Sequence, residues 1–365
     1  FQRMLEGMDV RVAILTGASK ARERREALAG IADGSIDLLI GTHALIEDRV
    51  QFSNLGFVVI DEQHRFGVEQ RARLWTKNEQ PPHILVMTAT PIPRTLAMTL
   101  YGDLDVSVID ELPPGRQPIR TVHYTDAARL RLFGFMRQEI KKGRQIYVVY
   151  PLIKESETMD YKDLQDGYEA ISRDFPLPEY VTTICHGKMK PEDKEESMRQ
   201  FKSGEANIMV ATSVIEVGVD VPNATVMVIE SAERFGLSQL HQLRGRVGRG
   251  SQQSYCILMS GEKLSKEARL RLEAMCETND GFRLAELDLK LRGAGDVNGT
   301  LQSGMAFDLK IANPTLDSQI LTVTREAAAE VLPADPTLTQ NGHEGLRELR
   351  KRYSGREEID FSQIS

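Results

Sequence analysis

Short apolar runs alternate with charged, helix-forming stretches along most of this 365-residue chain. The sequence predicts a first series of strands at residues 12–15, 36–40, 57–60, 84–87 and 106–109. It predicts a second series at residues 145–150, 181–185, 207–211, 226–229 and 255–259. Helices are expected between them, at residues 20–32, 70–75, 93–101, 126–142, 191–203 and 238–246. Because strands that alternate with helices form parallel sheets covered on both faces, we expect an α/β fold.

A proline-rich stretch separates the two series. Residues 111–118 read Glu-Leu-Pro-Pro-Gly-Arg-Gln-Pro, and so many prolines exclude both a helix and a central strand. We interpret the stretch as a linker between domains, since a chain of this length predicts two or three of them. Residues 154–178 are polar and rich in Asp and Glu, and we interpret them as an ordered insertion or a mobile loop.

Beyond about residue 262 the pattern becomes helical. Helices at residues 266–278 and 282–291 would form a hairpin around the turn Asn279-Asp280-Gly281, and a glycine-rich loop follows at 293–304. We expect the rest to be mostly helical, with about twenty weakly ordered residues at the end.

Composition excludes several classes of protein. The net charge of −7 argues against a surface that coats DNA throughout, although it is compatible with local basic grooves. Three widely spaced cysteines without a Cys-x-x-Cys pair support neither a zinc site nor disulfides, and they indicate a reducing compartment. We find no signal peptide and no apolar run near the ~20 residues of a membrane span, and we expect a cytoplasmic protein. Because the chain begins inside a helical pattern with Phe1, not Met, we expect it to be part of a longer protein.

Residues 238–249 form the most informative motif, Ser-Gln-Leu-His-Gln-Leu-Arg-Gly-Arg-Val-Gly-Arg. It carries Gln242, and it places Arg246 and Arg249 three residues apart, which is one side of a helical turn. The glycines between them allow a phosphate to approach closely. Two such guanidiniums can stabilise the charge that develops on a transferring γ-phosphoryl group. The alternative is a solvated basic helix.

A second motif, Asp-Glu-Gln-His at residues 61–64, follows the apolar run at 57–60. A buried strand that ends in adjacent carboxylates suits Mg²⁺ and a polarised water beside ATP. We expect Asp61 to coordinate Mg²⁺ and Glu62 to orient or deprotonate the water. His64 is interpreted as a coupling residue, because no second histidine stands at metal-ligand spacing. A helix N-cap is the alternative, but the two motifs together favour a nucleic-acid-stimulated ATP motor.

Polar groups follow several other predicted strands. Thr88 and Thr90 could relay hydrogen bonds between the carboxylates and the neighbouring domain, or simply form a strand-to-helix turn. Thr42 and the Thr16-Gly17 turn could bind a nucleic-acid backbone. His186 is equally well a core histidine or a phosphate contact.

Residues 211–220 are predicted to be a strand, a hydroxyl pair and the start of a helix. A helix N-terminus favours an anionic phosphate. Gly218 and Asp220 would therefore lie next to a bound nucleotide if this domain faces the first.

In this order, the motifs resemble those of superfamily 2 helicases and translocases. The similarity sharpens to the RecG family, bacterial ATP-dependent helicases that remodel branched DNA such as stalled forks and Holliday junctions. It is carried by residues 41–46 (Gly-Thr-His-Ala-Leu-Ile), 61–68 (Asp-Glu-Gln-His-Arg-Phe-Gly-Val), 87–94 (Met-Thr-Ala-Thr-Pro-Ile-Pro-Arg) and 235–244 (Phe-Gly-Leu-Ser-Gln-Leu-His-Gln-Leu-Arg). The related transcription–repair coupling factor typically has Asp-Glu-Glu-Gln at the second motif, so RecG is preferred.

The resemblance implies tandem RecA-like parallel-sheet domains, the first one truncated, plus a helical C-terminal segment. Residues 1–112 would be the C-terminal part of RecA-like helicase domain 1, residues 113–262 would be domain 2, and residues 263–365 would hold the hairpin, translocation loop and C-terminal helices. ATP and Mg²⁺ would bind between the domains, with Asp61 and Glu62 on one wall and Arg246 and Arg249 on the other. Nucleotide contacts would also come from Gln242, Gly218 and Asp220.

The family pattern also implies residues that couple hydrolysis to DNA movement or contact DNA: His64, Thr88, Thr90, Thr42, His186, Arg271, Arg292 and Gln302. The implied partners are branched double-stranded DNA and a single-stranded-DNA-binding protein, with no membrane and a monomeric state.

Two departures from the family pattern stand out. The chain has no Gly-x-x-x-x-Gly-Lys-[Ser/Thr] segment, and Gly187-Lys188 is followed by Met189. We expect the phosphate loop and the junction-binding wedge domain upstream of Phe1, and therefore no ATP hydrolysis by this chain alone. Leu301 stands where relatives usually have Arg. The alternatives are a translocase like the coupling factor and a non-catalytic nucleic-acid-binding scaffold.

Overall fold

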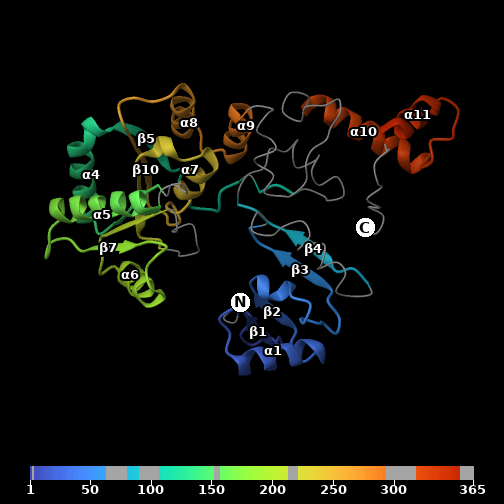
Figure 1. Cartoon of the computed structure of the whole chain (residues 1–365), viewed down its shortest axis with the longest axis horizontal. Helices are drawn as coiled ribbons and strands as arrows, with labels where there is room; N and C mark the ends of the chain where they lie inside the picture. The colour runs from blue at the N-terminus through green and yellow to red at the C-terminus, as the bar shows by residue number, and fades with distance from the viewer. Residues whose placement is uncertain are drawn as a thin grey trace. The chain divides into compact units, whose positions relative to one another are not determined.

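The computed structural model (Figure 1) describes residues 1, 4–62, 80–89, 107–109, 111–151, 157–212, 221–292 and 318–353. The chain divides into two compact units. Unit 1 comprises Phe1–Ala89 and Ala294–Ser365, and unit 2 comprises Thr90–Gly293. The domain boundaries predicted after residues 112 and 262 stay predictions.

Unit 1 contains two pairs of parallel strands. β1 (Val12–Leu15) pairs with β2 (Leu38–Gly41), and α1 (Ala21–Ala32) connects them. β3 (Phe57–Ile60) pairs with β4 (His83–Val86). A small core of Leu15, Ile31, Ala44 and Val50 holds the first pair, and at the second pair Ile46 packs against Ile60 of β3.

Two helices of unit 1 lie near the end of the chain, α10 (Ser318–Ala334) and α11 (Glu344–Tyr353). The buried Asp335 carboxylate organises their connection, because it accepts hydrogen bonds from the backbone N–H groups of Thr339 and Gln340 and from His343. These hydrogen bonds, that of Gln340 foremost, lower the pKa of Asp335. In the part of the chain that the structure describes, every helix is too short or too polar to cross a membrane.

Unit 2 is built on a six-stranded parallel sheet in the order β5-β10-β9-β6-β8-β7. Its strands are β5 (Arg120–Thr125), β6 (Gln145–Tyr150), β7 (Thr182–Cys185), β8 (Ile208–Thr212), β9 (Ala224–Ile229) and β10 (Tyr255–Ser260). Every residue of β8 and β9 is buried. Such continuous burial is typical of a parallel sheet that is covered on both faces.

Helices cover both faces of this sheet (Figure 1). α4 (Arg129–Lys141) and α5 (Glu157–Asp174) pack on one face. The other face carries α6 (Pro191–Ser203), α7 (Leu237–Arg244) and α8 (Lys266–Glu277). α9 (Gly281–Arg292) packs on α7 and α8 through residues that include Leu284.

Side chains of the central strand β6 alternate between these two layers. Ile146 and Val148 face α4 and α5, whereas Tyr147 and Val149 face the opposite layer. Each is at most 1% exposed, and complete burial of such a side chain contributes about 1.5–3 kcal/mol. The predicted α/β fold is therefore confirmed for this unit.

Two local expectations are wrong, and one strand was not predicted. Residues 157–174 form the helix α5 and not a mobile loop, because Leu164, Ile171 and Phe175 recur at helical spacing and are buried under the sheet. Residues 107–109 are not in a strand. The edge strand β5 was not expected at all. The helices predicted at 70–75 and 93–101 lie outside the described residues.

An ion pair between the half-buried Arg129 and the buried Glu230 marks the carboxyl edge of the sheet in unit 2. β6 leads into α5 on one face and its neighbour β9 leads into α7 on the other, so the edge between them is a topological switch point. Glu230, only 4% exposed, follows β9 and accepts two hydrogen bonds from Arg129, at 2.7 and 2.9 Å. Arg129 also donates to Asp126.

Replacing Arg129 by methionine should destabilise unit 2 by about 3 kcal/mol, because it leaves the Glu230 carboxylate buried without its partner. Hydrogen exchange of the β6 and β9 amides would measure the loss. Arg199→Ala is the matched control: its ion pairs with Glu196 and Glu205 are exposed, and they should contribute less than about 1 kcal/mol. Equal effects of the two variants would contradict the expected role of the buried pair.

Candidate functional site

Asp61 and Glu62 follow directly after β3, as the sequence predicts. Asp61 is exposed, and its Oδ1 accepts a hydrogen bond from the backbone N–H of Glu62 at 2.9 Å. Glu62 is half-buried and has φ of +53°, in the left-handed region that residues other than glycine seldom occupy. Strained backbone of this kind gathers at functional sites, which motivates a role for this pair. His64 lies outside the described residues.

Thr88 lies at the same edge as these carboxylates. Ile60 pairs with Val86 across β3 and β4, and the backbone N–H of Met87 then donates to the Ile60 carbonyl at 2.7 Å. Asp61 and Thr88 therefore leave paired strands at neighbouring positions. The predicted hydrogen-bond relay requires this arrangement. Thr90 lies outside the described residues.

Thr16 and Thr42 also leave paired strands together, because Leu15 of β1 pairs with Gly41 of β2. The backbone approach is so close that a Cβ at Gly41 would lie 2.1 Å from the Leu15 carbonyl oxygen. Only glycine fits at this position. The backbone N–H of Thr16 donates to Ser19 Oγ at 2.9 Å, which fixes the turn after β1.

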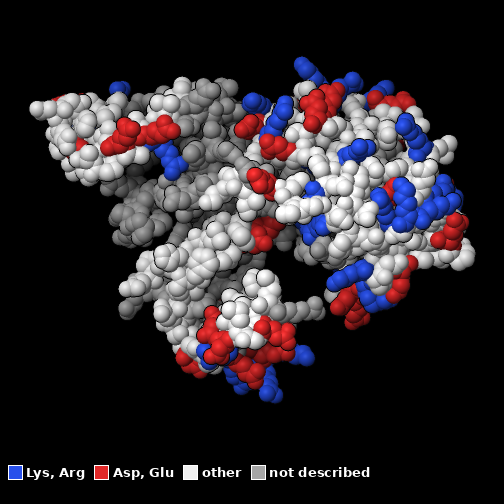
Figure 2. Space-filling view, turned by 180° about the vertical axis from the view of Figure 1, so that it is seen from behind, with Lys and Arg blue, Asp and Glu red and all other residues white. Residues whose placement is uncertain are grey.

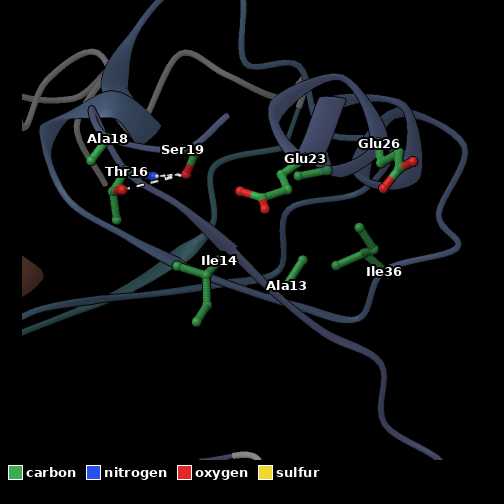
Figure 3. A pocket seen from close by; sticks show the side chains of 9 residues that line it. Ala13, Ile14, Thr16, Ala18, Ser19, Glu23, Glu26 and Ile36 are labelled. Atoms are coloured by element: carbon green, nitrogen blue, oxygen red, sulfur yellow. Dashed lines mark hydrogen bonds between the residues drawn. The ribbon is translucent and has the colours of Figure 1, made fainter. Parts of the chain in front are cut away.

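A hollow of about 570 Å³ opens between β1, this turn and α1 (Figure 3). Glu23 and Glu26 line it together with Thr16 and Ser19, and no Lys or Arg belongs to its lining within the described residues. Two carboxylates repel an anion, so this hollow does not suit a phosphate. The predicted backbone contact at Thr42 stays a prediction.

The arginine motif of unit 2 spans the end of α7 and the turn after it. Leu237, Leu240 and Leu243 are buried in the core, and they fix the helix in place. Gln242 and Arg246 are half-buried and Arg249 is exposed. The expectation that both arginines lie on one helical turn is wrong, since α7 ends at Arg244.

Backbone geometry explains this early helix end. Gly245 caps α7, and Gly248 has φ of +76°, which glycine adopts at little cost. Arg246 and Arg249 therefore belong to a turn that leads from α7 towards β10. Its local conformation, and not helical spacing, sets the directions of the two guanidiniums.

Arg244 is a buried residue that sequence reasoning missed. It is 2% exposed and donates hydrogen bonds to the carbonyls of Met275, at 3.0 Å, and Thr278, at 2.8 Å, at the end of α8. It also hydrogen-bonds His241 Nδ1 at 2.9 Å. Burial lowers the pKa of His241 to about 4, so the neutral imidazole can accept this bond. Arg244 thus ties α7 to the first helix of the predicted hairpin.

The predicted hairpin exists as α8 and α9, and a second contact fixes it to the rest of unit 2. Arg271 of α8 donates from Nη2 to the backbone carbonyl of Glu233, at 2.9 Å. Glu233 belongs to the short 3-10 helix Ala232–Arg234, between β9 and α7. The side chain of Arg292 and all of Gln302 and Leu301 lie outside the described residues.

His186 follows β7 and is 9% exposed. Burial lowers the pKa of His186, and the nearby positive charges of Lys194 and Lys188 lower it further. The burial agrees with the core alternative, and a phosphate contact stays a prediction. Gly218 and Asp220 lie outside the described residues, beyond the buried strand end at Thr212.

Three protein families match successive parts of the chain. A family described as DEAD/DEAH box helicase matches residues 1–99, and one described as helicase conserved C-terminal domain matches residues 129–251. One described as ATP-dependent DNA helicase RecG, domain 3, C-terminal, matches residues 278–365. Fold and family matches together thus place the chain in the class of proteins with RecA-like helicase domains.

Comparison with individual proteins identifies the family to which the chain belongs. The chain is 52% identical over 343 residues to a protein of Synechocystis sp. named ATP-dependent DNA helicase RecG, which is 94% of this chain and 41% of that protein. Its identity to the Bacillus subtilis protein of the same name is 50%, over 91% of this chain and 48% of that protein. A solved structure of RecG bound to a three-way DNA junction superposes with a TM-score of 0.66 at 42% identity, covering 88% of this chain and 41% of that one. The chain belongs to the RecG family, and it spans about half the length of the curated relatives it matches.

Proposed function

We propose that this chain is the part of an ATP-dependent DNA helicase that completes ATP hydrolysis and converts it into movement on branched DNA. The observation that carries the proposal is the 42% identity, over 88% of this chain, to RecG bound to a three-way DNA junction. The relatives from Synechocystis sp. and B. subtilis are also named ATP-dependent DNA helicases.

Mg²⁺ and ATP are the cofactors that this function requires. Asp61 offers an exposed carboxylate at the carboxyl end of β3. Mg²⁺ is usually held by one or two carboxylates together with phosphates and water. Bound Mg²⁺ would neutralise charge on the phosphates, while Glu62 orients or deprotonates the attacking water.

Arg246 and Arg249 would stabilise the negative charge on the γ-phosphoryl group during transfer. Exposure of Arg249 and partial exposure of Arg246 and Gln242 support this role, because all three can reach a ligand in solvent. Gly218 and Asp220 complete the proposed nucleotide contacts.

DNA contacts are proposed for Thr42 and His186, and coupling for His64, Thr88, Thr90, Arg271, Arg292 and Gln302. On the face of unit 2 seen in Figure 2, Lys and Arg side chains gather into a patch with only a few acidic ones among them. Local positive charge of this kind favours the phosphate backbone even when the net charge is negative. The family resemblance supports a monomer in the cytoplasm and a single-stranded-DNA-binding protein as further partner.

DNA-stimulated ATP hydrolysis tests the proposal. A protein that carries this chain together with a phosphate-binding loop should hydrolyse ATP faster with forked DNA than with linear duplex. Glu62→Gln should remove hydrolysis while nucleotide binding persists, since amide and carboxylate have similar shape but an amide is no base. The 365-residue chain alone should show no stimulated hydrolysis, because it lacks the segment that cradles the β- and γ-phosphates.

Three outcomes would contradict this account. Hydrolysis that DNA does not stimulate would favour the non-catalytic scaffold or another kind of ATPase. Equal stimulation by linear and forked DNA would favour a translocase like the coupling factor. Robust turnover by the chain alone would show that its phosphate site lies elsewhere in these residues.

A further inference from the structure

The proline-rich stretch belongs to unit 2 and is not a free linker. Pro113, Pro114, Gly115 and Arg116 form a β-turn in which the backbone N–H of Arg116 donates to the Pro113 carbonyl at 3.1 Å. Gly115 has φ of +80°. A type II turn needs a positive φ at its third position and favours proline at its second. The sequence Pro-Pro-Gly-Arg thus encodes a turn that presents the Arg116 side chain, and we call residues 113–120 the strap.

Arg116 reaches the arginine motif across 132 positions of sequence. Its Nε donates a hydrogen bond to the carbonyl oxygen of Gly248 at 2.6 Å. That carbonyl belongs to the peptide bond between Gly248 and Arg249. Because a peptide unit is planar, holding its carbonyl also fixes the direction in which the chain enters Arg249.

Packing reinforces this hydrogen bond. A Cβ on Gly248 would lie 2.9 Å from Cγ1 of Ile119, the strap residue that covers it. The positive φ at Gly248 is a second reason for glycine there. Strap and turn are therefore in direct contact at the residue that precedes Arg249.

Two more hydrogen bonds fasten the strap to the chain just after this turn. Gln253 Nε2 donates to the Pro118 carbonyl at 2.9 Å. The backbone N–H of Arg120 donates to the Ser254 carbonyl at 3.0 Å, where β5 begins beside β10. The strap thus holds the Arg249 turn from Gly248 to Ser254.

We propose that Arg116 is a positioning residue for Arg249, which it orients through the Gly248 carbonyl. The inference rests on the proposed role of Arg249 in ATP hydrolysis. Arg249 is exposed and its side chain is long, so the direction of the backbone that carries it sets where the guanidinium can reach. A shift of the strap would be transmitted to Arg249 as a change of hydrolysis rate.

Steady-state ATP hydrolysis with saturating forked DNA tests this in the protein that carries the chain and a phosphate-binding loop. Arg116→Ala should lower kcat by about 10- to 100-fold, since a misplacement near 1 Å can cost that much. KM for ATP should change less than about twofold, because Arg116 does not touch the nucleotide. Arg116→Lys, which retains a donor, should recover part of kcat. Arg120→Ala is the control: this strap arginine is exposed and contributes only its backbone N–H, so kcat should be unchanged.

Double substitution separates positioning from general support of the fold. If Arg116 acts through Arg249, Arg116→Ala should add little to the loss already caused by Arg249→Ala. The inference would be overturned if the two losses were fully additive. It would also be overturned if Arg116→Ala kept the wild-type kcat while Arg249→Ala was inactive. Either result would leave the proposed function intact. Wild-type activity of Arg249→Ala would instead refute the proposed role of Arg249 itself.

A folding defect in Arg116→Ala would show as a lower Tm. In that case Gly115→Ala is the deciding variant, because it strains the turn that presents Arg116 without a clash: no atom lies within 4 Å of the added Cβ. A loss of kcat with normal Tm in this variant supports the inference, and unchanged kcat overturns it.

Discussion

Replacing Arg249 by alanine should slow ATP hydrolysis by roughly 10³-fold or more in the protein that carries this chain with a phosphate-binding loop, the effect of losing an arginine finger. We expect the same of Arg246→Ala. The loss should lie in kcat, because the guanidinium acts on charge that exists only in the transition state. Since Arg249 is exposed, its replacement should leave Tm and DNA affinity nearly unchanged. Phosphate release with saturating forked DNA measures the rate.

Arg199→Ala is the matched control for that loss of charge, because Arg199 lies on α6 and its ion pairs within the described residues are with exposed carboxylates. It should retain the wild-type rate. Normal hydrolysis by Arg249→Ala or Arg246→Ala would remove that arginine from the proposed site.

Replacing Arg271 by alanine should abolish fork unwinding while DNA-stimulated ATP hydrolysis largely persists. Arg271 fastens α8 to the Glu233 carbonyl, in the connection between β9 and α7. This contact joins the hairpin to the segment that leads into α7, and Arg246 and Arg249 lie in the turn after that helix. Loss of the contact should uncouple hairpin movement from nucleotide state. Strand displacement and phosphate release, measured on the same fork, give the two activities.

Arg269→Ala provides the comparison, since Arg269 is exposed on the same helix, and it should unwind normally. We expect Arg292→Ala and Gln302→Ala to behave like Arg271→Ala. Parallel loss of unwinding and hydrolysis would indicate a folding or nucleotide-site defect, and unchanged unwinding would make Arg271 a purely structural contact.

The sequence predicted the central strands of unit 2 well because their apolar runs are continuous. β6, β8, β9 and β10 are nearly completely buried, so a parallel sheet was the natural reading. β5 was not predicted, because it is an edge strand of sequence Arg-Thr-Val-His-Tyr-Thr. Its side chains are half-exposed, and its neighbour in the sheet is β10. α5 was not predicted either, because its sequence is mostly polar and its buried hydrophobic residues, Leu164 and Ile171, stand seven positions apart.

Residue types at the proposed site were predictable, but the contacts that position them were not. Asp61 and Arg249 belong to short motifs whose chemistry can be read from local sequence. Arg244 and Arg116 instead donate to backbone carbonyls more than 30 and 130 residues away, respectively. A backbone acceptor leaves no mark on the sequence, because every residue carries a carbonyl. Only the folded chain shows that these arginines hold α8 and the Arg249 turn.

ATP-dependent unwinding of a three-way DNA junction by a chimaera tests the central claim most directly. In it, this chain replaces the matching part of the Synechocystis sp. relative, to which it is 52% identical. We predict that the chimaera unwinds the junction with ATP, and that Arg249→Ala within the transplanted chain stops it. A folded, DNA-binding chimaera that hydrolyses no ATP, or one whose unwinding survives Arg249→Ala, would contradict the account.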